Sequence, residues 1–253
     1  MKKLNKVINL ILPIITIACV LLLWDFASIK AGSDYILPSV RKTLIALKDV
    51  LFLKNSKFPT AFLHTTIRSL IAFCSSFTLA SIMAFLANRY LKASKIIGTL
   101  IGIIRALPTI AIILILLFWT SVQIAPIIVT MLVVLPTTYT HIKSALDGVD
   151  KSSLEAGVVD GANKVGLFLK VELPQIAPSI YSAVGAGISL NFKLMVAAEV
   201  LSTTIKSLGN TLNSYNYNGQ IAEMLAVVIT IIIFGTLIEF VFNKISQKTG
   251  KWR

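Results

Sequence analysis

The sequence predicts an all-α membrane protein that crosses the bilayer about six times. Of its 253 residues, 56% are hydrophobic and only 14% are charged, whereas about a quarter of the residues of a soluble domain are charged. Long apolar runs without charge recur along the chain, and backbone polar groups in hydrocarbon must be satisfied within each segment, so these runs are expected to be helices. The net charge of +13 comes from basic residues that flank the runs, which indicates anionic lipid headgroups rather than nucleic acid as the neighbours.

Each predicted span rests on a stretch of roughly 20 apolar residues, the length that crosses a bilayer. The first run, Val7–Trp24, is longer than a signal-peptide core and is not followed by a small-x-small cleavage site, so we interpret it as a retained span. The stretch Ala106–Ile142 contains no Asp, Glu, Lys or Arg, and its length suits two crossings. We expect the spans at approximately residues 7–29, 62–87, 105–120, 124–142, 174–201 and 221–242.

The apolar run Ile96–Ile104 is too short to cross a bilayer. It lies between Lys95 and Arg105, so we expect it at the membrane surface or against other helices. A re-entrant segment is the alternative.

Basic residues in short loops stay on the cytoplasmic side, and their distribution predicts that both termini are cytoplasmic. The N-terminal Lys2 and Lys3 and the C-terminal Lys251 and Arg253 fit this orientation. The first outer loop is an exception, since it carries several basic residues, Lys54 among them.

The longest cytoplasmic loop, residues 143–173, departs from the apolar pattern. Ser152 and Glu155 have the spacing of a capping box, which predicts a short helix that begins at Ser152, and Gly161 is suited to end it. A second short helix is expected from about Asn163 to Val171, followed by a turn back into the membrane at Leu173–Pro174. The loop could be a simple connector, but its length of about thirty residues favours a docking surface for a soluble partner.

This loop resembles the EAA loop of ABC-importer permeases. Glu155–Gly157, three residues, Gly161, nine residues, Val171, one residue and Leu173–Pro174 match the spacing of the family pattern Glu-Ala-Ala, Gly, Ile, Leu-Pro. The differences are Gly157 for the third small residue and Val171 for Ile. Gly157 lowers helix propensity by roughly 1 kcal/mol relative to Ala, which predicts a slightly weaker helix.

Further matches, in the same order along the chain, resemble nitrate/sulfonate/taurine-type permeases. They are Ile36–Ser39, Arg105–Pro108, Val196–Glu199 and Ser207–Gly209. The resemblance implies a single permease domain over residues 1–253 with the MetI-like fold, in the bacterial cytoplasmic (inner) membrane. It also implies a homodimer of the permease, two cytoplasmic ABC ATPase subunits and an extracytoplasmic solute-binding protein as partners. The substrate would be a small solute of the nitrate, sulfonate, taurine or vitamin-precursor class.

The resemblance also implies which residues act. Those expected to contact the ATPase are Glu155, Ala156, Gly157, Gly161, Ala162, Leu173 and Pro174. The chain has no Gly-x4-Gly-Lys-Ser/Thr phosphate loop, so we expect it to bind no cofactor and expect the partner ATPase to use ATP and Mg²⁺.

Two ionisable residues lie in the fifth span, where charge is costly and often marks a pathway. Lys193 could attract an anionic substrate, or it could pair with another helix. Glu199 lies near the outer end and could reach the headgroups. Both are candidate substrate-pathway residues.

A membrane-embedded enzyme and a proton-coupled secondary transporter are the alternative functions. Asp160–Ala162 is faintly similar to the start of the CDP-alcohol phosphotransferase motif, but Lys164 and Val165 occupy its Ala-Arg positions. His64 and His141 lack the surrounding carboxylates or cysteines of a metal site, and Cys19 and Cys74 lie within apolar runs. A proton-coupled transporter would need carboxylates near the midplane, whereas the acidic residues here lie mostly in loops or at span ends.

Overall fold

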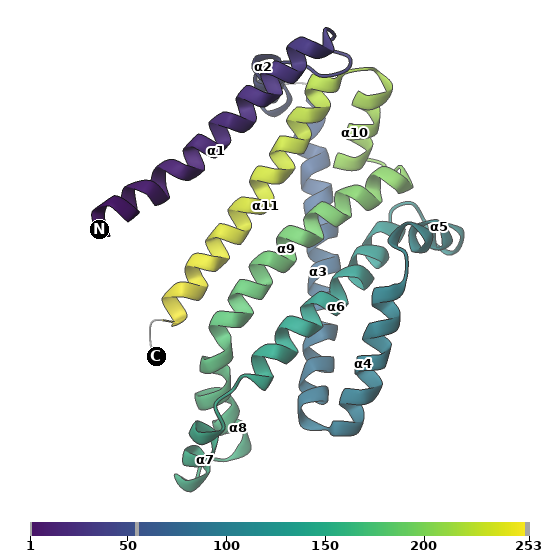
Figure 1. The fold of residues 1–253 in the computed structure, drawn as a ribbon. Helices are drawn as coiled ribbons and strands as arrows, with labels where there is room; N and C mark the ends of the chain where they lie inside the picture. Colours follow the sequence, from purple (N-terminus) through teal and green to yellow (C-terminus); the bar gives the residue numbers. More distant parts are fainter. Residues whose placement is uncertain (1, 54–55, 251–253) are drawn as a thin grey trace. The chain divides into compact units, whose positions relative to one another are not determined.

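The computed structural model describes residues 2–53 and 56–250, and every regular element within these ranges is helical (Figure 1). Lys54, Lys251 and Arg253, which the predicted topology used, lie outside them. In chain order the elements are α1 (Lys2–Ala31), α2 (Val40–Phe52), α3 (Phe58–Arg89), α4 (Leu91–Ala106), α5 (Thr109–Trp119), α6 (Ala125–Asp147), α7 (Lys151–Val159), α8 (Lys164–Leu167), the π-helix η1 (Phe168–Glu172), α9 (Leu173–Ser202), α10 (Leu208–Tyr217) and α11 (Ile221–Gly250).

Five of these helices are long and apolar enough to cross a membrane. They are Ile11–Ala31, Phe58–Arg89, Ala125–Asp147, Lys164–Ser202 and Ile221–Thr249. A sixth crossing is reached only if α4 and α5, which meet at an angle of 91°, count together as one bent span. The predicted number of about six is therefore consistent with the helices found.

The third span differs from the prediction, which placed one helix over residues 105–120. The chain breaks between α4 and α5 at Leu107 and Pro108, and Pro108 precedes α5 in an extended conformation. Proline cannot donate a backbone hydrogen bond, and its ring disfavours the α conformation at the residue before it. The run Ile96–Ile104, expected at the membrane surface or against other helices, lies inside α4 and forms one arm of this bent pair. Its Ile101 is buried against residues of α3 and α6, as the second of these expectations predicts.

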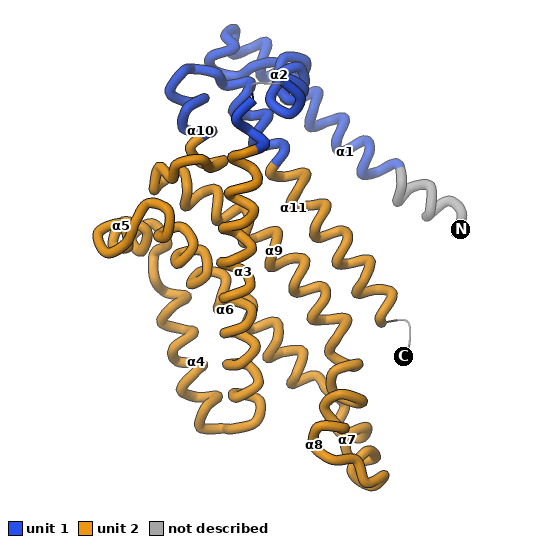
Figure 2. Tube along the Cα trace, turned by 180° about the vertical axis from the view of Figure 1, so that it is seen from behind, with its two compact units in different colours: residues 1–59, 211–230 blue, residues 60–210, 231–253 orange. Residues whose placement is uncertain are grey.

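The chain divides into two compact units (Figure 2). Unit 1 comprises residues 1–59 and 211–230, and unit 2 comprises residues 60–210 and 231–253. In unit 1, the segment after α1 is held by two hydrogen bonds: Trp24 Nε1 donates to the Pro38 carbonyl at 3.0 Å, and the Val40 amide donates to Asp25 Oδ1 at 2.9 Å. Ser39 then caps α2, so the segment Ile36–Ser39 connects α1 to α2 through specific contacts.

Unit 2 is built around α6 and α9, which pack along each other. Small residues of α3, such as Ala80 and Ala84, let α3 approach Leu135 and Tyr139 of α6 in a buried cluster. A second cluster joins α5, α6 and α9 through Ile113, Val129 and Ala198. The segment α7–α8 projects beyond the ends of α6 and α9 (Figures 1 and 2), so unit 2 holds a packed helical body and an exposed extension.

Candidate functional site

The exposed extension begins with a strong helix cap. The side chain of Asp150 accepts hydrogen bonds from the amides of Ser152 and Ser153, at 3.1 and 3.2 Å. The hydroxyl groups of the same two serines also donate to Asp150, led by that of Ser152, and together these bonds lower the pKa of the exposed Asp150 carboxyl to about 2. The predicted cap at Ser152 is therefore wrong by two residues. An aspartate is as good a cap as a serine, and this one can accept from both amides at once.

The end of α7 follows the prediction. Gly161 has a φ of +77°, the left-handed conformation that favours glycine. The amide of Gly161 donates to the Val158 carbonyl and that of Ala162 to the Gly157 carbonyl, each at 3.0 Å, which is the Schellman arrangement. Asn163 then caps α8 by accepting from the Gly166 amide at 2.7 Å. The chain thus reverses within a few residues, with its backbone groups satisfied.

Gly157 is explained by packing inside the loop. A Cβ added there would lie 2.6 Å from Cδ2 of Leu167, so α7 and α8 meet most closely at this point. Glu155 and Ala156, in contrast, are exposed. Val158 and Val159 are 59% and 86% exposed, and no feature of the family pattern had pointed to them. The outer surface of α7 therefore combines one carboxylate with small and apolar side chains.

The loop joins the membrane body without a turn. The helical path is continuous from Lys164 to Ser202, so the predicted turn at Leu173–Pro174 is absent. The π-helix η1 explains this: the Leu173 amide bonds to the Phe168 carbonyl, one residue further back than in an α-helix. The wider turn accommodates Pro174, which has no amide to donate and whose ring would clash in a regular turn, so the helix continues into α9.

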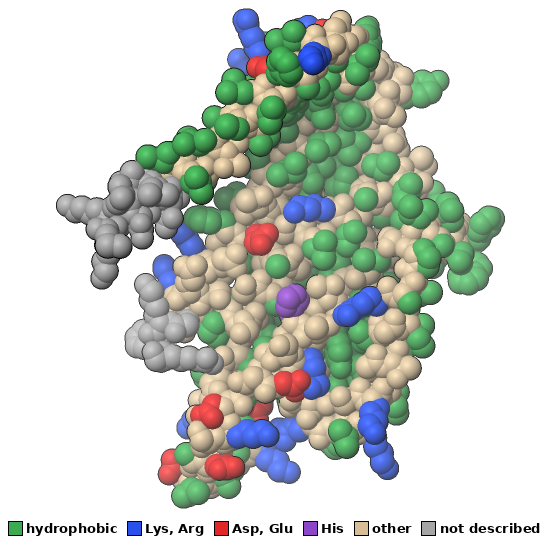
Figure 3. Space-filling model, in the orientation of Figure 1, with side chains coloured by type: hydrophobic (Ala, Val, Ile, Leu, Met, Phe, Trp, Pro, Cys, Tyr) green, Lys and Arg blue, Asp and Glu red, His purple; other side chains and the backbone are tan. Residues whose placement is uncertain are grey.

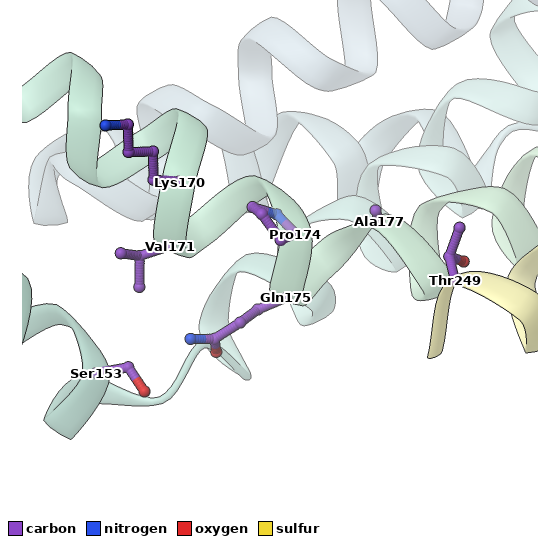
Figure 4. A pocket seen from close by; sticks show the side chains of 7 residues that line it. All are labelled: Ser153, Lys170, Val171, Pro174, Gln175, Ala177 and Thr249. Atoms are coloured by element: carbon purple, nitrogen blue, oxygen red, sulfur yellow. The ribbon is translucent and has the colours of Figure 1, made fainter. Parts of the chain in front are cut away.

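A cavity of about 520 Å³ lies between the start of α7, η1 and the end of α11. Its lining includes Ser153, Val171, Gln175 and Thr249 (Figure 4), with Gln175 extending from α9 toward the segment that carries Ser153. Gln175 Oε1 accepts from the Asp150 amide at 3.0 Å, which ties the beginning of α7 to the base of α9. Charged side chains gather at this end of unit 2 (Figure 3).

The opposite end of α9 carries a buried ion pair. Glu199 has no exposed surface, and its Oε1 accepts from Arg68 Nη1 of α3 at 3.0 Å. Its other oxygen accepts from the Thr65 hydroxyl at 2.7 Å and from the Gly209 amide at 3.4 Å. The interpretation of Glu199 as reaching the headgroups is therefore wrong. Its partner Arg68 lies within α3, inside the predicted second span at residues 62–87.

The same cluster holds the segment between α9 and α10. Arg68 donates to the Ile205 carbonyl at 3.2 Å and to the side chain of Gln123, which follows α5. A Cβ added at Gly209 would lie 2.5 Å from the backbone carbonyl carbon of Glu199, so only glycine fits there. We call Thr65, Arg68, Gln123, Glu199 and Gly209 the outer clasp.

Lys193 lies between these two ends of α9 and is exposed. It belongs to no ion pair among the described residues, so the expected interhelix partner is not an acidic side chain. Its alkyl chain instead lies against Gly235 of α11, where an added Cβ would be 3.2 Å from Lys193 Cε. The buried Ser189 hydroxyl lies 2.9 Å from the same point and has no hydrogen-bond partner within the described part of the chain.

Comparisons with known proteins agree with this architecture. Residues 76–251 match the family described as binding-protein-dependent transport system inner membrane component. A protein of Methanocaldococcus jannaschii, provisionally named an ABC transporter permease protein, is 25% identical over 251 residues, which is 97% of this chain and 93% of that protein.

Two solved structures share the fold at lower identity. A chain of the MetNI methionine ABC transporter in an inward-facing conformation superposes with a TM-score of 0.66 at 18% identity, over 75% of this chain and 94% of that one. A chain of an amino acid ABC transporter crystallised with histidines gives 0.60 at 15% identity, over 78% and 94%. The projecting loop and the helical body around it define a multi-pass permease subunit of the ABC-importer class. The chain belongs to the family of binding-protein-dependent transport system inner membrane components, as the resemblance of its EAA loop predicted.

Proposed function

We propose that this permease subunit forms a homodimer, docks two ABC ATPase subunits through its α7–α8 segment and receives a small solute from an extracytoplasmic binding protein in a bacterial cytoplasmic membrane. ATP and Mg²⁺ would be used by the ATPases, and this chain would take no catalytic part. The proposed substrates are those that the resemblance to nitrate/sulfonate/taurine-type permeases implies: nitrate, sulfonates, taurine or vitamin precursors.

The observation that carries the proposal is the surface of α7. Val158 and Val159 present apolar area on a helix that has little contact with the membrane body, and exposed apolar groups on a projection favour a protein contact. Glu155 and Ala156 are exposed beside them. Gly161 and Ala162 form the turn, and Gly157 sets the spacing of the two short helices.

The connection to α9 supports a mechanical role. Leu173 and Pro174 continue the helix rather than interrupt it, so the segment from Lys164 to Ser202 can move as one rod of 39 residues. Asp150 is tied to Gln175, which fixes the start of α7 to the same rod. Movement of a docked ATPase would therefore pass directly to α9 in the membrane.

One face of α9 is the proposed substrate pathway. Ala186, Leu190, Lys193 and Ala197 are exposed at helical spacing, and Lys193 is the one charge among them. Lys193 is thus kept as a proposed pathway residue that would favour an anion. Glu199 is not, because it is fully buried within the outer clasp.

Substitution of Gly161 tests the coupling role. Gly161→Val forces a β-branched residue to a φ of +77°, whereas Gly161→Asn places there a residue that adopts this conformation readily. We expect Gly161→Val to reduce ATP-driven uptake by at least tenfold in vesicles with the co-expressed ATPase, and Gly161→Asn to retain most of it. Both should insert normally, because no atom lies within 4 Å of an added Cβ.

Co-purification separates this proposal from a membrane enzyme or a proton-coupled transporter. The intact complex should contain the ATPase in stoichiometric amount. Uptake that proceeds with no ATPase subunit bound, or that is unchanged in Gly161→Val, would refute it.

A further inference from the structure

An apolar groove of about 410 Å³ lies in unit 2 between α3, α6 and the start of α9. Its only polar lining residue is Ser81, whose hydroxyl is already used in a 2.7 Å hydrogen bond to the Phe77 carbonyl. The groove therefore offers hydrocarbon contacts alone, inside segments that cross the membrane.

The groove is open at its side. Ile82 and Leu86 of α3 are 54% and 41% exposed, and Leu173 on the opposite wall is 40% exposed. Apolar side chains that line an empty groove lack dispersion contacts on that side. In a bilayer, a lipid acyl chain can fill the groove and restore these contacts.

Two cations lie beyond the groove, toward the projecting loop. Phe85 of α3 and Phe168 of η1 both line the groove, with their rings in edge contact at 5.9 Å. Arg89, one turn after Phe85, lies over its ring at 5.3 Å. Lys164, one turn before Phe168, shares its helical face, since the Phe168 amide bonds to the Lys164 carbonyl.

Both cations are available to an anion. Arg89 and Lys164 are exposed and belong to no ion pair in the described ranges. The neighbouring carboxylate of Asp147 is already bound by Lys143 and by Asn88, so it does not neutralise them.

We propose that this groove binds one anionic phospholipid, with an acyl chain between α3 and α9 and the headgroup phosphate at Arg89 and Lys164. Basic sites at the ends of membrane helices bind such headgroups, while the groove supplies chain contacts that a free phosphate could not use. Because Phe168 belongs to the π-helix that joins α8 to α9, a bound lipid would brace this junction. That consequence rests on the proposed coupling function, whereas the binding site itself does not.

Lipid binding is tested on the intact transporter by native mass spectrometry with phosphatidylglycerol and phosphatidylcholine of identical chains. We expect one phosphatidylglycerol per permease chain to be retained most tightly. Arg89→Gln with Lys164→Gln should weaken it on the order of thirtyfold, about fivefold for each cation. Lys244→Gln with Lys248→Gln removes the same charge from the end of α11 and should leave this lipid in place.

A second variant tests the chain-binding part of the site. Ser81→Phe fills the groove with an aromatic ring and should displace the lipid without altering any charge. In the unmodified protein, a photoreactive acyl chain should label residues 77–86 and 168–180. Equal retention of both lipids, equal loss in the two charge variants, or label elsewhere would overturn the proposal. A cross-link from Ile82 to a second permease chain would assign the groove to the dimer instead.

The ATPase rate of the reconstituted complex separates this proposal from the proposed function. If the lipid binds but the rate is the same with and without it, the site stands and its role in coupling is refuted.

Discussion

The two ends of α9 are built in opposite ways. At one end, the α7–α8 segment is exposed, and its caps and its turn are formed by contacts between residues only a few positions apart, such as Asp150 with Ser152. At the other end, the outer clasp holds the fully buried Glu199 and joins α3 to α9, with Arg68 and Glu199 separated by 131 positions in the chain. The first region is suited to meet a partner, and the second to hold helices and a loop in fixed positions. One end of α9 thus continues into the exposed α7–α8 segment, and the other end is held by the outer clasp.

The largest effect is expected when the ion pair of the outer clasp is broken. Arg68→Ala leaves the fully buried Glu199 carboxylate without its cation, and loss of one partner of a buried pair costs roughly 3–5 kcal/mol. The thermal midpoint of the purified protein in detergent should fall sharply, while ATPase binding to any remaining folded protein should persist. Arg68→Ala combined with Glu199→Gln removes the unpaired charge and should recover part of the loss. Equal destabilisation by the single and double variants would show that the charge is not the cause.

An intermediate effect is expected at the cap of α7. Asp150→Ala should fray the start of the helix and reduce coupled uptake several-fold, whereas Asp150→Asn keeps an acceptor and should reduce it less. The folded-state pKa of about 2 lies below the ordinary value of 3.8. The cap should therefore contribute fully above about pH 4 and be lost as the pH falls toward 2. Amide exchange of Ser152 and Ser153 should be protected at neutral pH and accelerate beyond its intrinsic pH dependence only within that acidic window.

The smallest effect is expected at Gly157. Gly157→Ala gains roughly 1 kcal/mol of helix propensity, but its Cβ would require the flexible end of Leu167 to turn aside. We expect uptake and the thermal midpoint to stay close to those of the original protein. Gly157→Leu is the contrasting variant, since its larger side chain cannot be accommodated by Leu167 alone. A large loss in Gly157→Ala would show that this position itself contacts the ATPase.

These two regions also differ in how well the sequence predicts them. Gly161 and Asn163 act within one turn of their own positions, so the end of α7 and the start of α8 could be placed from residue types and spacing. Asp150 was missed as the cap because Ser152 and Glu155 fit a capping box equally well. Whether Asp150 or Ser152 caps the helix depends on the path of the preceding chain.

Arg68 and Glu199 could not be paired from the sequence, because nothing local brings α3 beside α9. Two charges near the ends of different spans were the available signal. The bent pair α4–α5 was missed for a related reason: a charge-free run gives the length of apolar chain, and Pro108 decides where its helix breaks. The family, the all-helical fold and the approximate number of spans were predictable, whereas the contacts between helices were not.

The π-helix η1 determines how far α8 is rotated about the helix axis relative to α9. One additional residue in a helix turns everything beyond it by about 100°, because a regular turn holds 3.6 residues. The orientation of α8 relative to α9 therefore depends on the number of residues in η1. A change of a single residue in the length of η1 would therefore turn α8, and the proposed docking surface that follows from it, to another side of α9.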